Sequence, residues 1–115
     1  MTLEDFEKET AAAIKSLPVF FRERLDNVAV LVRLRPTAAQ ARRFGRGLMG
    51  LYEGVPQPDR GQAYSGAMPD KITLFKANIE SAGGDLGKEI RDVLLHEVAH
   101  HFGISDEELK AKGLY

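Results

Sequence analysis

The chain has 115 residues, a size typical of one compact domain, and its 43% hydrophobic content excludes an intrinsically disordered protein. Sixteen basic and seventeen acidic residues give a net charge of −1, so the composition does not predict a nucleic-acid partner. The absence of cysteine excludes disulfides and thiolate metal sites, and leaves imidazole and carboxylate groups as candidate metal ligands.

Neither the amino terminus nor any apolar run predicts export or a membrane partner. The first seven residues are acidic and lack the basic and apolar regions of a signal peptide. The longest apolar run, residues 28–32, is far too short to cross a bilayer. We therefore expect a cytoplasmic protein, and the sequence does not indicate its oligomeric state.

The first third of the chain predicts two helices and a strand. Residues 3–17 place apolar side chains at helical spacing, with Thr2 as the N-cap. Pro18 should end this helix, and residues 19–25 fit one or two further helical turns. Residues 27–35 are the clearest strand, and apolar character on both faces favours an inner strand.

The middle of the chain gives weaker signals. Residues 37–44 fit a short helix, and residues 48–52 fit a second strand that Gly50 weakens. Residues 53–70 are rich in Gly and Pro without periodicity, and a loop this long in a small domain is expected to be either mobile or functional, here as a gate for the cleft. Residues 72–76 fit a further short strand.

Two helices are predicted at the carboxyl end. Gly83 and Gly84 break the chain, Asp85 can cap, and a helix should run from residue 86 to about 102. A short helix follows over residues 106–112. The expected fold is a single α+β domain over residues 1–115, with a small mixed sheet of three or four strands whose order the sequence does not reveal.

All three histidines fall in the string His96-Glu97-Val98-Ala99-His100-His101. On a helix, His96 and His100 lie about 40° apart and one turn separated, so both imidazoles can reach one ion. Glu97 lies too far round the helix to be an obvious ligand, yet close enough to accept a proton from a metal-bound water. This is the chemistry of an HExxH zinc site.

A third ligand is expected from Asp106. Gly103 lies just past the last helical turn, where glycine can take a positive φ and reverse the chain toward the histidines. Two histidines and a carboxylate leave the fourth zinc position for water. The alternative for Asp106 is capping alone, because residues 105–108 also form a capping box.

The string His96-Glu97-x-x-His100-x-x-Gly103-x-x-Asp106 resembles the extended zinc signature of metzincin-like zincins. The doubled histidine, Leu109, residues 51–56 and residues 72–75 are similar to one bacterial group, the minimal zincin-like metallopeptidases. This resemblance implies a cut-down zincin fold with a small sheet, an active-site helix and an edge strand over the cleft. It also implies one zinc ion and a peptide or protein substrate.

Two features keep an alternative function open. No methionine follows Asp106, so the Met-turn of larger relatives is missing, and the chain ends nine residues later without a second subdomain. The leading hypothesis is a zinc metallopeptidase with Glu97 as general base. The alternative is a weak or inactive zincin-like module that binds metal and protein partners.

The remaining candidate residues have secondary roles. A substrate is expected to pair with an edge strand formed by Ile72, Thr73, Leu74 and Phe75. His101 points toward the apolar stripe of its helix, and we expect it to support the ligands through Asp92 or a main-chain carbonyl. Candidates for stabilising an oxyanion are Tyr52, Tyr64 and Tyr115. The arginines at 35, 42, 43 and 46 are interpreted as a solvated surface.

Overall fold

A computed structural model of the chain describes residues 1–54 and 69–111. For Asp106 it describes the main chain but not the side chain. Most of the predicted loop, residues 55–68, lies outside the described residues. The elements in the described part are α1 (Leu3–Ser16), α2 (Val19–Leu25), β1 (Val28–Arg33), α3 (Ala38–Phe44), β2 (Gly50–Glu53), β3 (Asp70–Phe75), α4 (Lys76–Ser81), α5 (Leu86–His101) and α6 (Asp106–Ala111). The α+β expectation is confirmed.

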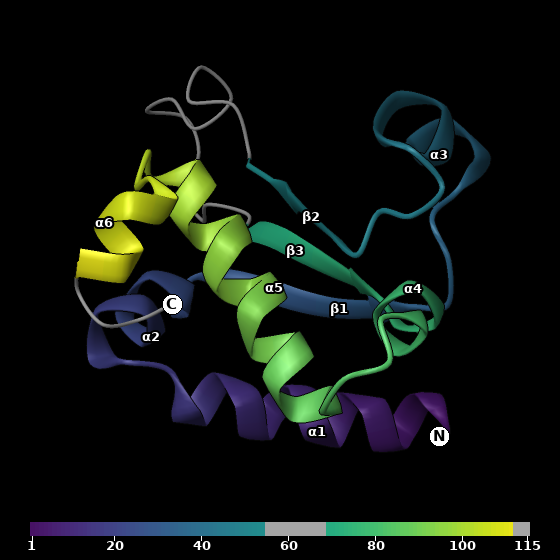
Figure 1. The fold of residues 1–115 in the computed structure, drawn as a ribbon, viewed down its shortest axis with the longest axis horizontal. Helices are drawn as coiled ribbons and strands as arrows, with labels where there is room; N and C mark the ends of the chain where they lie inside the picture. Colours follow the sequence, from purple (N-terminus) through teal and green to yellow (C-terminus); the bar gives the residue numbers. More distant parts are fainter. Residues whose placement is uncertain (55–68, 112–115) are drawn as a thin grey trace.

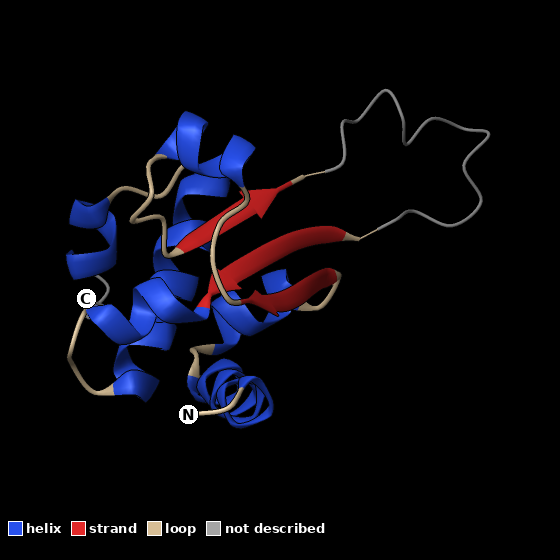
Figure 2. Cartoon of the chain, turned by 90° about the vertical axis from the view of Figure 1, so that its right-hand side faces the viewer, coloured by secondary structure: helices blue, strands red, loops and turns tan. Residues whose placement is uncertain are grey.

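The three strands form one mixed sheet in the order β1-β3-β2. β1 runs parallel to β3, with Val30 beside Ile72, and β2 runs antiparallel to β3, with Tyr52 beside Ile72. Figure 2 shows the sheet from the side, with α1 viewed end-on beneath it.

This strand order reverses two expectations from the sequence. The strand predicted to be inner, β1, lies at one edge of the sheet. The strand predicted to be the substrate edge, formed by Ile72, Thr73, Leu74 and Phe75, is the central strand and pairs on both sides. All four of its side chains are buried. Within the described part of the chain, the free edges of the sheet belong to β1 and β2.

One face of the sheet is covered by helices. α5 crosses in front of the strands and α1 runs below it, packed against both α5 and β1 (Figure 1). The largest fully buried side chains include Phe6 of α1, Phe21 of α2, Ile72 and Leu74 of β3, and Ile90 and Leu94 of α5. Burying an aliphatic or aromatic side chain of this size contributes about 1.5–3 kcal/mol, so this interface holds α5 in place.

The predicted helix caps are observed. Thr2 Oγ1 accepts a hydrogen bond from Asp5 N at 3.0 Å, and Asp85 Oδ1 accepts one from Lys88 N at 3.3 Å. α4 was not predicted, because its six residues offer only Ile79 as a strong apolar signal. No helix in the described part of the chain has the length and apolar character needed to cross a membrane.

Candidate metal centre

The two histidines of the motif project from one face of α5. Their ring centroids are 6.2 Å apart and the rings are tilted by 50°. His96 is half-buried and His100 is exposed, so the pair sits where the helix surface meets solvent. Zinc binds imidazole nitrogen at about 2.0–2.1 Å, and two rings at this separation can share one ion.

His96 is held in one orientation by the helix itself. Its Nδ1 lies 2.9 Å from the main-chain oxygen of Asp92, one turn earlier. A carbonyl oxygen can only accept, so Nδ1 carries the proton and Nε2 keeps its lone pair. Zinc-binding histidines commonly use this arrangement to fix the ring and its tautomer. The donor set on α5 therefore fits a zinc ion.

Glu97 extends from α5 to the main chain of β2. Its Oε1 accepts a hydrogen bond from the N–H of Tyr52 at 3.1 Å. Burial raises the pKa of the Glu97 carboxyl above its ordinary value, and this effect outweighs the Tyr52 N–H and the nearby His100 and His96, which lower it. A carboxylate that binds a proton more readily than usual is a better general base.

Gly50 allows α5 to approach β2 closely. A Cβ atom at position 50 would lie 2.6 Å from Val93 Cγ1 and 3.4 Å from Glu97 Cγ. Any side chain there would push the helix from the strand. The glycine that weakened the strand prediction is thus the residue that lets Glu97 reach Tyr52.

The predicted glycine reversal ends α5. Gly103 has φ +72°, its N–H donates to His100 O at 3.2 Å, and Ile104 N donates to Ala99 O at 2.7 Å. These two bonds form a Schellman motif. Figure 1 shows that α6 then turns back beside the last turns of α5. Leu109 anchors α6 in the core with 1% of its surface exposed.

Asp106 is the first residue of α6, directly after this reversal. Capping of α6 is performed by Ser105, whose Oγ accepts a hydrogen bond from Glu108 N at 3.1 Å. Among the side chains that the structure describes, no set of three His, Asp or Glu residues is arranged to hold a metal ion. The ligand role of Asp106 therefore stays a prediction.

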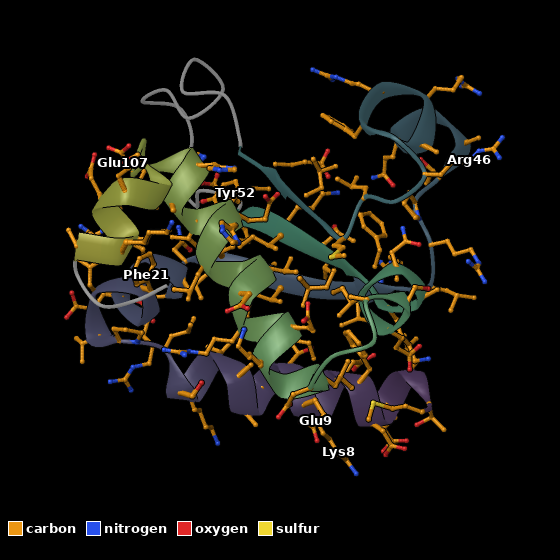
Figure 3. The ribbon with its side chains drawn as sticks, in the orientation of Figure 1. Lys8, Glu9, Phe21, Arg46, Tyr52 and Glu107 are labelled. Carbon is orange, nitrogen blue, oxygen red and sulfur yellow. The ribbon has the colours of Figure 1, made fainter. Side chains whose placement is uncertain are left out.

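His101 belongs to a second cluster at the end of β2. Its ring stacks on Tyr52 with centroids 3.9 Å apart, and its Nε2 lies 3.9 Å from Asp70 Oδ2. Tyr52 donates its hydroxyl to the same Asp70 oxygen at 2.8 Å. His101 is exposed, and these neighbours differ from the expected Asp92 or main-chain carbonyl. In Figure 3, Tyr52 lies beside the C-terminal half of α5.

Of the tyrosine candidates for stabilising an oxyanion, Tyr52 contacts Glu97 only through its main-chain N–H, and its hydroxyl donates to Asp70. Tyr64 and Tyr115 lie outside the described residues. Sequence reasoning missed Asp70 entirely. It ends a Gly- and Pro-rich segment and carries no motif, so only its hydrogen bond with Tyr52 in the folded chain reveals it. The main-chain N–H of Tyr52 has no sequence signal either.

Comparisons with known proteins identify a family and a similar fold. A family model described as zincin-like metallopeptidase matches residues 25–114. The fold is similar to that of a conserved hypothetical protein from Thermo thermophilus, with a TM-score of 0.54 and 23% identity over 89% of this chain and 94% of that one. No curated protein sequence matches the chain.

Proposed function

Because the chain belongs to the zincin-like metallopeptidase family, we propose that it hydrolyses peptide bonds with one zinc ion held by His96, His100 and Asp106. The observation that carries this proposal is the placement of Glu97 on α5, between the two imidazoles in sequence and against the edge of β2 in space. A bound zinc ion would polarise the substrate carbonyl and lower the pKa of a coordinated water to about 7.

Glu97 is the proton acceptor in this proposal. Its partly buried carboxylate takes the proton of the attacking water at an Oε atom and delivers it to the leaving amine. The Tyr52 N–H supports this role, because a hydrogen bond to Oε1 fixes the carboxylate while Oε2 stays available for the proton. His96 contributes Nε2, since its Nδ1 is bound to Asp92 O.

The free edge of β2 supplies the surface for the substrate main chain. Phe75 N donates to Met49 O at 2.9 Å, so residues 49, 51 and 53 of this antiparallel pair face β3. The main-chain groups of Gly50 and Tyr52 therefore face away from β3, and because the Tyr52 N–H already donates to Glu97 Oε1, the main-chain groups of Gly50 are the ones offered to an added strand. An extended peptide can add to this edge, and its backbone would then lie beside Glu97.

The test is a Glu97→Gln variant, because glutamine can still accept the Tyr52 N–H bond but cannot take a proton. We expect zinc content equal to the parent and loss of peptide cleavage by about 100-fold or more. Glu23→Gln is the matched control, since Glu23 is exposed on α2, away from the site. Cleavage at the parent rate by the Glu97→Gln variant would refute the mechanism.

A broad peptide screen separates this proposal from the metal-stabilised interaction module. The zincin-like enzyme cleaves part of the screen when loaded with zinc and none after chelation. The module cleaves nothing in either state, but its melting temperature falls when the metal is removed.

A further inference from the structure

A groove of about 300 Å³ lies between α3 and β2. One face of α3 lines it through Ala39, Gln40, Arg43 and Phe44, and residues 51–53 of β2 line the other side. Figure 1 places α3 beyond β2, on the side away from β3. The groove therefore runs along the same free strand edge that faces Glu97.

The groove opens on the sheet face opposite α5. A Cβ at Gly50 would point at Val93 and Glu97 of α5, so position 50 faces the helix. Side chains alternate along a strand, and Leu51 and Glu53 therefore face the other way, toward α3. A peptide added to this edge has the same alternation. One of its side chains points to the α5 face and the next points into the groove.

The charge in the groove is set by Arg43. Glu53 is the acidic residue of the lining, and its Oε1 lies 3.7 Å from Lys71 Nζ, which offsets its charge. The Arg43 guanidinium lies 5.0 Å from the Phe44 ring centroid and has no carboxylate partner in residues 1–54 and 69–111. An arginine next to an apolar ring can bind a carboxylate through two parallel hydrogen bonds.

α3 is ordered although it buries none of its residues. Reciprocal bonds between Thr37 and Gln40 cap its start at 2.9 and 3.1 Å. Asn78 Nδ2 holds the following segment by donating to Arg46 O and Leu48 O, both at 2.8 Å. Caps and one side-chain clamp thus hold in place a helix whose Phe44 remains 44% exposed. A bound chain would cover this ring.

We propose that the groove between α3 and β2 binds an acidic side chain of an extended peptide, with Arg43 as the residue that determines this specificity. The proposal rests on the proposed function, because it assumes that the peptide backbone pairs with β2. In the bound peptide, the acidic residue is one or three positions away from a residue whose side chain points to the α5 face. Arg42 and Arg46 do not line the groove, and Arg46 points away from the body of the molecule (Figure 3).

Binding to the zinc-loaded Glu97→Gln variant tests the groove without requiring turnover. The probes are fluorescein-labelled peptides of alanine, serine and leucine with one Glu moved along the chain, each paired with a Gln twin. We expect one Glu position to lower Kd about tenfold relative to its twin. Adding Arg43→Gln should remove this difference, while Arg42→Gln should keep it. Equal Kd values for all twins, or a preference that survives Arg43→Gln, would overturn the proposal.

Cleavage assays use the protein with Glu97 intact. They distinguish failure of the acidic-groove proposal from failure of the proposed peptidase function. Cleavage of Glu and Gln peptides at the same kcat/KM would leave the peptidase in place and remove the acidic subsite. Arg43→Gln should lower kcat/KM for the Glu peptide about tenfold and leave the Gln peptide unchanged. A chain that cleaves neither peptide, yet shows the Arg43-dependent binding, would contradict the peptidase and support the groove.

Discussion

The main-chain N–H of Tyr52 donates to Glu97 Oε1 at 3.1 Å, joining residues 45 positions apart. This bond ties the free edge of β2 to the helix that carries both histidines. The Glu97 carboxylate can therefore accept a proton while it lies beside the backbone of an extended peptide. The geometry of the site therefore depends on how closely α5 approaches β2.

Replacing Gly50 with alanine tests this approach. The new Cβ would lie 2.6 Å from Val93 Cγ1, so α5 or β2 has to move. We expect a loss of about 1–3 kcal/mol in the free energy of unfolding, the usual cost of overpacking. Urea denaturation measures this loss, and cleavage should fall with it because Glu97 moves relative to Tyr52.

Gly47→Ala is the matched control for that variant. A Cβ at position 47 has no heavy atom within 4 Å, so its stability should stay within about 0.5 kcal/mol of the parent. Val93→Ala should recover part of the loss when combined with Gly50→Ala, because it removes the clashing methyl group. Equal stability of the Gly50→Ala and Gly47→Ala proteins would contradict the close-packing argument.

Replacing Tyr52 with phenylalanine removes one hydrogen bond and keeps the ring. Asp70 loses the hydroxyl donor at 2.8 Å, while the stack on His101 and the N–H bond to Glu97 remain. We expect about 1 kcal/mol lower unfolding free energy and unchanged zinc content. Tyr52→Ala should cost more, since it also removes the stacked ring. A Phe variant as damaging as the Ala variant would show that the hydroxyl, not the ring, holds the cluster.

The sequence predicted local features well because their causes are local. Helical periodicity and the caps at Thr2 and Asp85 located α1 and α5, and Gly103 located the reversal after α5. The HExxH spacing placed His96 and His100 on one helix face for the same reason.

Strand order depends on contacts distant in sequence, and there the predictions were wrong. Apolar residues on both faces made residues 27–35 resemble an inner strand, but the chain places β3 between β1 and β2. The Asp70 cluster and the close packing at Gly50 also arise from this pairing. Neither has a signature within a short window of sequence.

Substitution of the predicted ligands should separate zinc binding from folding. His96→Ala, His100→Ala and Asp106→Ala are each expected to lower zinc content and affinity, because each removes one of three protein donors. His101→Ala should retain zinc, since its ring lies against Tyr52 and Asp70. Elemental analysis of purified proteins checks the content, and competition with a chelator checks the affinity. Full zinc retention by Asp106→Ala would exclude its carboxylate as a ligand.

Burial of Glu97 predicts a pH dependence of stability in the chelator-treated protein. Burial raises the pKa of this carboxyl above its ordinary value of 4.5, so the folded chain holds the proton more tightly than the unfolded chain. Stability from this group is therefore greatest in acid and falls as pH rises through the range above 4.5. Glutamine has no charge to bury. Glu97→Gln should match the parent in acid and be more stable near neutral pH, as measured by urea unfolding. The difference in unfolding free energy between the Glu97→Gln variant and the parent should therefore grow with rising pH. A difference that stays constant or shrinks would show that Glu97 is well solvated as an anion.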